Sequence, residues 1–164
     1  MCVPELEGHS EGVPWTVDSG AAEPVADPEQ FGDCTLEPSP GSIAGQCYVG
    51  PGKGNRIPNL GQFLARRMLG NGLMSCVKFQ GAKVRKPLLA VSGLNDKGNP
   101  CWFDHDSTGG SYIIPGDAPE LSEIRRLIAS IKTRVRMDRK GGIFQLRNWQ
   151  MSNSSGFPRP AQKP

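Results

Sequence analysis

Gly70-Asn71-Gly72 is the feature that most restricts how this chain can fold. It stands between two apolar runs, FLARRML at 63–69 and LMSCVKFQGAKV at 73–84. An Asn-Gly pair in such a position is typical of a tight β-hairpin, because Gly and Asn accept the positive φ angles that the reversal requires. We therefore expect residues 63–84 to form two paired antiparallel strands.

Two further segments have the same character. The stretch GQCYVGPGKGNRIPNLGQ at 45–62 places two strand-like runs around a glycine-rich tip, and the runs PCWF and GSYIIP enclose a polar turn at 104–109. With 21 Gly and 15 Pro in 164 residues, the chain is rich in turn-forming residues. These features predict a mainly β domain. The Pro-, Gly- and acid-rich stretch 26–42 is predicted to be a long loop.

The run PLLAVSGL at 87–94 is almost continuously apolar. It predicts a strand covered on both faces, with Leu89 and Val91 buried. A different pattern follows from Asp117, where apolar residues recur at helical spacing. They predict one amphipathic helix from Asp117 to about Met137, followed by a last strand in IFQLRNW at 143–149.

The charge and the cysteines narrow the class of protein. A net charge of +3 is too small to indicate a nucleic-acid partner by itself. No apolar run is long enough to span a membrane, and residues 1–12 lack the layout of a signal peptide. Five scattered cysteines and two histidines show no metal-ligand spacing, so we expect reduced thiols, no metal and an intracellular protein.

The stretch VPWTVDSGAAEPV at 13–25 places Asp18-Ser19-Gly20 directly after a strand-like run. Asp-Ser-Gly is ordinary turn chemistry in most proteins. An acid fixed at a strand end is also the arrangement that a catalytic carboxylate needs. The tripeptide alone leaves both interpretations open.

Over residues 13–104 the chain resembles the retropepsin-like aspartic proteases of retrotransposon and retroviral polyproteins. Asp18-Ser19-Gly20-Ala21 is similar to the family's D-[ST]-G-A motif, and YVGPGKGNRIPNLG at 48–61 looks like its flap hairpin. PLLAVSGL resembles the apolar strand that supports the catalytic loop. The longer run KPLLAVSGLNDKGNPCWFD at 86–104 is similar to a segment of copia-type polyproteins.

The resemblance implies a small closed β-barrel at 13–115, extended by a helix and a strand at 116–150, with flexible tails at 1–12 and 151–164. It also implies an endopeptidase that needs no cofactor. The implied residues are catalytic Asp18, Ser19 and Gly20, substrate-binding Ala21, Gly50, Pro51 and Gly52, and the supporting strand residues Leu89, Val91 and Gly93.

A single D-[ST]-G motif in a short chain implies a homodimer, in which a second Asp18 completes the pair of carboxyls. Two carboxyls at that distance share one proton, so one can activate water while the other donates to the peptide carbonyl. The tetrapeptide Asp106 to Gly109 has one residue too many for a second motif and is interpreted as a turn.

Two alternatives remain open. The chain departs from the residues usual in the family at Ser92 and Pro24, at Pro51 and Lys53 in the hairpin tip, and in the length of the loop from Ala26 to Ser42. These departures are compatible with a catalytically decayed relic that serves as an interaction module. The basic residues of 125–139 permit a nucleic-acid-binding helix, but Glu120, Glu123 and Asp138 dilute that charge and aromatic residues are absent from it. We therefore expect a polypeptide substrate and a homodimer, and neither a membrane nor a nucleic acid as partner.

Overall fold

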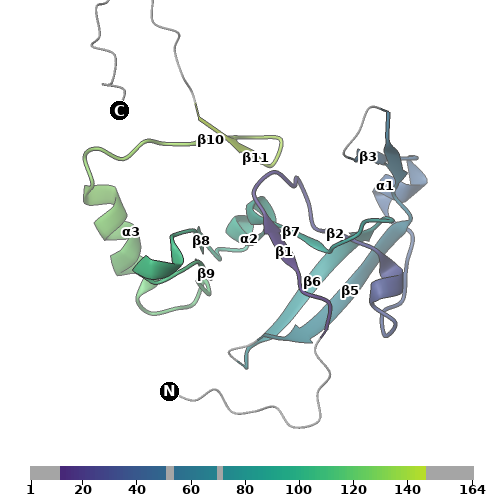
Figure 1. Cartoon of the computed structure of the whole chain (residues 1–164), viewed down its shortest axis with the longest axis horizontal. Coiled ribbons are helices and arrows are strands. Elements are labelled where there is room, and N and C mark those ends of the chain that lie inside the picture. The colour runs from purple at the N-terminus through teal and green to yellow at the C-terminus, as the bar shows by residue number, and fades with distance from the viewer. Residues whose placement is uncertain (1–11, 51–53, 70–71, 147–164) are drawn as a thin grey trace, which may run out of the picture.

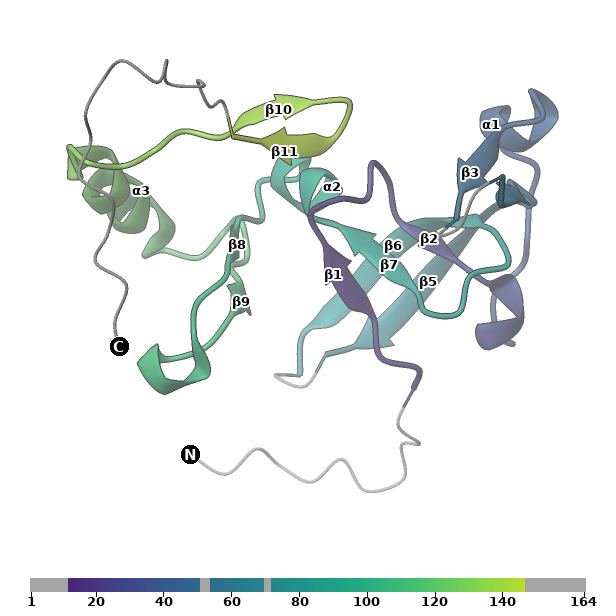
Figure 2. The same ribbon diagram turned by 45° about the horizontal axis from the view of Figure 1, so that its top comes forward.

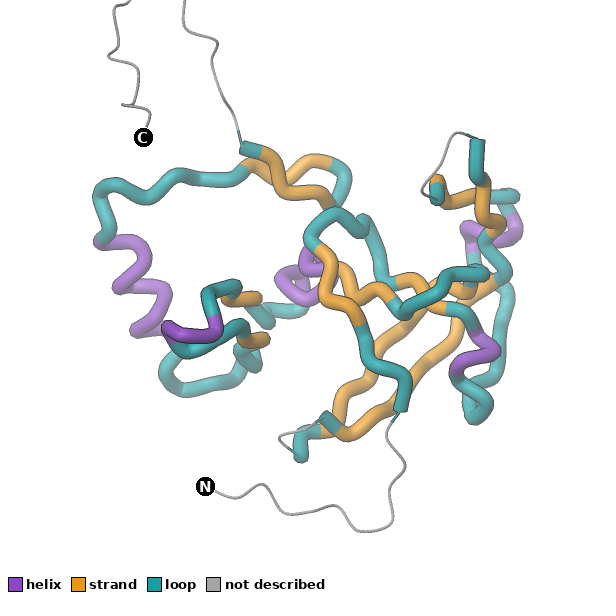
Figure 3. Tube along the Cα trace, in the orientation of Figure 1, coloured by secondary structure: helices purple, strands orange, loops and turns teal. Residues whose placement is uncertain are grey.

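The computed structural model describes residues 12–50, 54–69 and 72–146. Its centre is a five-stranded sheet with the order β1-β7-β2-β6-β5 (Figure 1). The bounds are β1 Thr16–Asp18, β2 Val25–Ala26, β5 Gly61–Met68, β6 Met74–Gly81 and β7 Leu88–Ala90. The mainly β class is confirmed, and Figure 3 shows the five-stranded sheet in the right half of the view, with shorter strands also at the top and left of the centre.

The predicted closed barrel is wrong for the described residues, because β1 and β5 form the two open edges of the sheet. Closure requires strands long enough to tilt and stagger around an axis. Here β1 and β7 have three residues each and β2 has two. Only β5 and β6, with eight residues each, have the length of ordinary sheet strands.

The β5–β6 hairpin confirms the prediction drawn from Gly70-Asn71-Gly72. The strands pair antiparallel from Gly61↔Gly81 to Met68↔Met74, and Gly72 has a φ of +80°. Gly70 and Asn71 lie outside the described residues. Along β5 the side chains alternate between buried and exposed, which places one face of the hairpin on the core.

Four aromatic side chains form the core on that face. The Phe63 ring lies 5.7 Å from the Phe79 ring and 5.2 Å from the Phe31 ring, and Trp15 packs edge-on at 5.3 Å from Phe79. Phe31 comes from the stretch 26–42, which was predicted to be a loop. That prediction is wrong in part, because the stretch contains a 3-10 helix at Pro28–Gln30 and the helix α1 at Pro40–Ile43.

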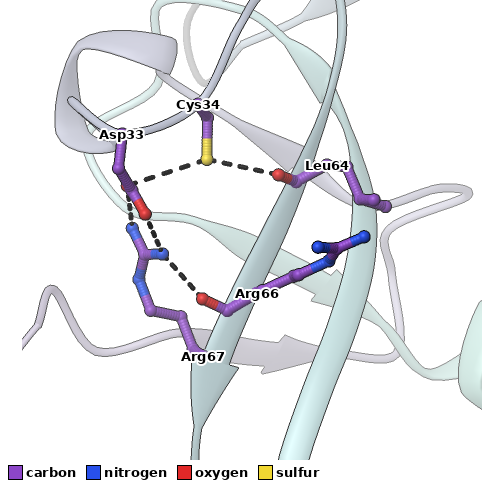
Figure 4. A network of polar contacts seen from close by, with 5 residues as sticks. All are labelled: Asp33, Cys34, Leu64, Arg66 and Arg67. Atoms are coloured by element: carbon purple, nitrogen blue, oxygen red, sulfur yellow. Dashed lines mark hydrogen bonds and ion pairs between the residues drawn. The ribbon is translucent and has the colours of Figure 1, made fainter.

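The edge strand β5 is covered by Asp33 and Cys34, from the segment that carries Phe31, and by Arg67 of the strand itself (Figure 4). Cys34 Sγ donates to the Leu64 carbonyl at 3.3 Å, and the Arg67 guanidinium donates to the Arg66 carbonyl at 2.7 Å. The same guanidinium holds the Asp33 carboxylate at 2.6 and 2.8 Å and lowers the pKa of Asp33. Burial raises the pKa of Cys34. These contacts occupy carbonyls that another strand would otherwise pair with.

The supporting strand is shorter than predicted. β7 ends at Ala90, and Val91–Asp96 forms the helix α2, so Val91 and Gly93 are helical rather than extended. Leu89 and Val91 are nevertheless buried, as expected, with 6% and 5% of their surface exposed. A short apolar run does not by itself distinguish a buried strand from a buried helix, which explains the error.

Two smaller hairpins are confirmed. β3 (Cys47–Val49) pairs antiparallel with β4 (Arg56–Pro58), and β8 (Cys101–Trp102) pairs with β9 (Tyr112–Ile113). The tip residues 51–53 lie outside the described part of the chain. Asp106 to Thr108 forms a 3-10 turn between β8 and β9, in agreement with the interpretation of that stretch as a turn.

The predicted helix is present as α3, but it covers only Leu121–Ser130. The Ser130 hydroxyl and the Arg134 guanidinium donate to carbonyls of its last turn, and Ile131 is already extended. Side-chain bonds of this kind replace the helical bonds that a longer helix would make. The predicted start at Asp117 is also wrong, because Asp117 to Glu120 precede the helix.

The apolar stripe of α3 is largely uncovered. Leu121 is buried, whereas Leu127 and Ile128 are 51% and 40% exposed. After α3 the chain forms one more antiparallel hairpin, β10 (Asp138–Lys140) with β11 (Ile143–Gln145), which lies beside α2 (Figure 2). β11 confirms the predicted last strand over part of its range. None of the helices in the described part has the length and apolar character needed to cross a membrane.

Candidate active site

Asp18 lies where two parallel strands end. β1 pairs with β7 in the register Val17↔Leu89 and Asp18↔Ala90, and α2 begins at the next residue, Val91. Val17 packs against the core and Leu89 is part of it, so the strand end is held from beneath. The half-buried Asp18 is therefore the last residue of β1 before the chain turns away from the sheet.

The Asp18 carboxylate is fixed by the turn that follows it. The Gly20 N–H donates to Asp18 Oδ1 at 2.7 Å. A Cβ on Gly20 would lie 3.2 Å from the same oxygen, which is tighter than most such contacts. Ser19 and Gly20 are exposed and Ala21 is half-buried. The backbone thus orients a carboxylate that solvent can reach, in the geometry of an Asx turn.

Residues 18–24, here called the motif loop, contact α2 and the C-terminal hairpin. The fully buried Ser92 donates through its hydroxyl to the Ala22 carbonyl at 3.3 Å. Gly93 faces Pro24, whose ring would lie 3.8 Å from a Cβ at that glycine. Ser92 and Pro24, which depart from the residues usual in the proteins that the sequence resembles, therefore both contribute to the packing between this loop and α2. Gly142, between β10 and β11, also lies against Ala22.

An acidic residue of the motif loop connects it to the β3–β4 hairpin. Glu23 Oε1 accepts a hydrogen bond from the Tyr48 hydroxyl at 2.8 Å and another from Gln46 Nε2 at 3.1 Å. Burial, together with the hydrogen bond to Glu23, raises the pKa of Tyr48. The hairpin that resembles a flap is thus attached at its base to the loop that carries Asp18.

The structure brings most of the predicted residues together. Asp18, Ser19, Gly20 and Ala21 share the motif loop, with Leu89 and Val91 buried in the elements that support it. Gly50 follows β3, where its N–H donates to the Asn55 carbonyl at 2.9 Å. Pro51 and Gly52 lie outside the described residues.

The sequence analysis missed Glu23, Tyr48 and Asn59, which link the motif loop to the hairpin. They are far apart in the sequence and follow no recognisable spacing. Asn59 offered the best signal, as an amide in the polar stretch before β5 that proves to be buried. The sequence contains no signal for the contact between Glu23 and Tyr48, because that contact depends on how the β3–β4 hairpin packs against the motif loop.

A hollow of about 330 Å³ lies elsewhere, at the β5 edge of the sheet. Three strands separate that edge from β1, so the hollow is not part of the Asp18 site. Residues 12–50, 54–69 and 72–146 contain no group of three His, Cys, Asp or Glu side chains arranged to hold a metal ion. The four described cysteines, Cys34, Cys47, Cys76 and Cys101, are free thiols.

Comparisons of the chain with protein-family models, with curated proteins and with solved structures found no match.

Proposed function

We propose that the chain is an aspartic-type endopeptidase that acts as a homodimer on polypeptide substrates. The observation that carries the proposal is the position of Asp18. Its carboxylate stands at the end of β1 beside β7, is oriented by the Gly20 N–H, and remains open to solvent. The resemblance of the sequence to copia-type polyproteins supports a retroelement polyprotein as the substrate.

The chemistry requires two carboxyls that share one proton. The charged carboxylate removes a proton from water as the water oxygen attacks the peptide carbonyl carbon. The protonated carboxyl gives its proton to the carbonyl oxygen, which yields a tetrahedral gem-diol. As the C–N bond breaks, the first carboxyl gives the proton that it took from water to the leaving nitrogen, and the second carboxyl takes a proton back from a gem-diol hydroxyl, so that the pair again shares one proton. Asp18 supplies one carboxyl, and Asp18 of a second copy supplies the other.

The remaining site residues have matching tasks. The Gly20 N–H holds Asp18 Oδ1, which leaves the second carboxylate oxygen for water or substrate. Ser19 is exposed at the loop tip, where its hydroxyl is available to the partner's loop. The β3–β4 hairpin would close over a bound peptide.

The test is cleavage of a diverse peptide mixture by the purified chain at pH values from 3 to 7. We expect a bell-shaped pH profile on the acidic side of neutral. Asp18→Asn should reduce cleavage by about 10²-fold or more, and Asp106→Asn, in the exposed turn after β8, should leave it unchanged. Equal rates for Asp18→Asn and the wild-type chain would refute the proposal.

A non-enzymatic interaction module is the second candidate, and one observation favours it. Large apolar side chains are exposed on the β8–β9 hairpin and α3: Trp102, Phe103, Tyr112, Leu127 and Ile131. Surfaces of this kind commonly mark protein contacts. A folded chain that cleaves no peptide at any pH would support this candidate. Nucleic-acid binding gains less support, because Glu123 and Asp96 already pair with Arg126 and Arg139.

A further inference from the structure

A buried amide organises the polar contacts at the base of the β3–β4 hairpin. Asn59 has 7% of its surface exposed, and its Oδ1 accepts the Gly61 N–H at 2.9 Å. Because an N–H must face an acceptor, this bond fixes which end of the amide is oxygen. Asn59 Nδ2 therefore has two hydrogens to share among three oxygens. Gln80 Oε1 on β6 lies 3.0 Å away, and on the side of the hairpin the Tyr48 hydroxyl and Gln46 Oε1 lie 3.2 and 3.3 Å away.

The Tyr48 hydroxyl transmits this arrangement to the motif loop. It has one hydrogen to donate and lone pairs with which to accept. With Asn59 as its donor, the hydroxyl hydrogen is directed to Glu23 Oε1 at 2.8 Å. A hydrogen bond to a carboxylate is stronger than one between neutral groups. One path from the buried amide to the loop therefore runs through this hydroxyl, and a second runs through the Gln46 side chain, whose Nε2 donates to Glu23 Oε1 at 3.1 Å.

We propose that Glu23 and Tyr48 form a latch that sets the position of the β3–β4 hairpin relative to the motif loop, with Asn59 donating to the Tyr48 hydroxyl. The value of the latch for catalysis depends on the proposed peptidase function, whereas the latch itself can be tested without it. Tyr48 and Glu23 act here as positioning residues, because they hold the covering hairpin and do not touch the reacting atoms.

The geometry supports this role over one in general stability. Glu23 lies five residues after Asp18, and Tyr48 is the middle residue of β3. Hydrogen-bonded strand pairing joins β3 to β4 but does not join either of them to the five-stranded sheet. The chain ties β4 to β5 through Asn59 and Leu60, and the hydrogen bonds of Tyr48 and Gln46 to Glu23 join the hairpin to the motif loop.

The experiment is hydrogen–deuterium exchange of the full chain, read at the amides of β3 and β4 and compared with those of β5 and β6. Tyr48→Phe and Glu23→Ala should each speed exchange in β3 and β4 by about tenfold or more, as expected for losing a hydrogen bond to a charged group. Exchange in β5 and β6 should not change. Tyr112→Phe is the matched control, since it removes a hydroxyl that bonds to Gly109 in a different hairpin.

Two more variants test the coupling. Glu23→Gln keeps an oxygen that accepts from Tyr48, so it should retain most of the protection. Glu23→Ala removes the bond from Gln46 Nε2 as well as the bond from Tyr48, so the double variant Tyr48→Phe with Glu23→Ala should exchange no faster than Glu23→Ala alone. The latch is overturned if Tyr48→Phe exchanges like Tyr112→Phe, if the two single effects add, or if Glu23→Gln is as fast as Glu23→Ala.

Kinetics then separate the latch from the peptidase proposal. If the hairpin closes over a bound peptide, Tyr48→Phe should raise KM several-fold and leave kcat within about twofold, since it weakens binding of substrate and transition state alike. A fall in kcat at unchanged KM would contradict the positioning role. If the wild-type chain cleaves no peptide but the variants show the predicted exchange pattern, the peptidase proposal is refuted and the latch is retained.

Discussion

Gly142 lies directly against Ala22 of the motif loop. A Cβ on Gly142 would come within 2.9 Å of the Ala22 Cα and 3.0 Å of its carbonyl oxygen, so only glycine fits there. Gly142 belongs to the C-terminal extension, outside the region that resembles the retropepsin-like proteases. The hairpin β10–β11 is thus packed on the loop that carries Asp18, four residues from the carboxylate.

The Gly142 contact can be tested with its neighbour as the control. Gly141 and Gly142 both have positive φ, at +58° and +82°, but a Cβ on Gly141 would meet nothing within 4 Å. Both alanine variants carry the cost of a left-handed residue, and only Gly142→Ala meets backbone. We expect faster hydrogen exchange in β10, β11 and the Ala22 region for Gly142→Ala alone. Equal exchange in the two variants would show that the contact between Gly142 and Ala22 does not stabilise the packing of the hairpin on the motif loop.

The ion pair between Arg139 of β10 and Asp96 of α2 should make the docking of the β10–β11 hairpin sensitive to acid. The Arg139 guanidinium bonds both oxygens of the Asp96 carboxylate and holds the pKa of Asp96 below its ordinary value. A lowered pKa means that the pair stabilises docking fully above about pH 4, where a free Asp is charged. That contribution is lost as the pH falls through the lowered value.

The measurement is exchange or chemical shift at the β10 amides from pH 6 to pH 2. Asp96→Asn should undock the hairpin partly at pH 6 and remove the change between pH 4 and pH 2. Arg126→Gln, which breaks a comparable exposed pair on α3, should leave β10 unaffected. The effect will be small, because exposed pairs are screened by solvent.

Leu89 should be the costliest single truncation beneath the site. It is 6% exposed and belongs to the core with Val17 and Phe79, so Leu89→Ala leaves a cavity that the strand β7 cannot fill. We expect a loss of about 2–5 kcal/mol in the free energy of unfolding, measured in urea. Leu127→Ala, at a position 51% exposed on α3, is the control and should cost less than about 1 kcal/mol. Similar costs would place Leu89 outside the core.

The local elements could be predicted from the sequence where turn chemistry and apolar runs coincide. Asn71-Gly72 specified the β5–β6 hairpin, since only certain residues accept the φ angles of a tight turn. The burial of Leu89 followed from its apolar run. The predictions that failed concern features that packing and side-chain contacts decide. One apolar run contains both β7 and the start of α2. The helix α3 stops at Ser130, where side chains donate to its last carbonyls.

The candidate site shows the same division. The position of Asp18 at a strand end could be predicted, because an apolar strand runs directly into Asp-Ser-Gly. Its parallel pairing with β7 and the contacts of Ala22 with Ser92 and Gly142 join residues about 70 and 120 positions apart. No local pattern records such contacts. The closed barrel failed for this reason as well, since closure depends on pairing between distant edges.

The last prediction concerns the number of Asp18 carboxylates that a working site contains. If each site needs one from each of two chains, a dimer of wild-type and Asp18→Asn chains has a single carboxylate and is inactive. Above the dissociation constant of the dimer, adding the variant should lower wild-type activity in proportion to the wild-type share of the total. Activity should fall to about half at equal amounts and to about a tenth at ninefold excess, as random pairing requires. Asp106→Asn, added in the same amounts, should cause no loss, because its dimers keep both carboxylates. Activity that stays constant as Asp18→Asn is added would mean that one chain suffices, and the two-fold site would be wrong.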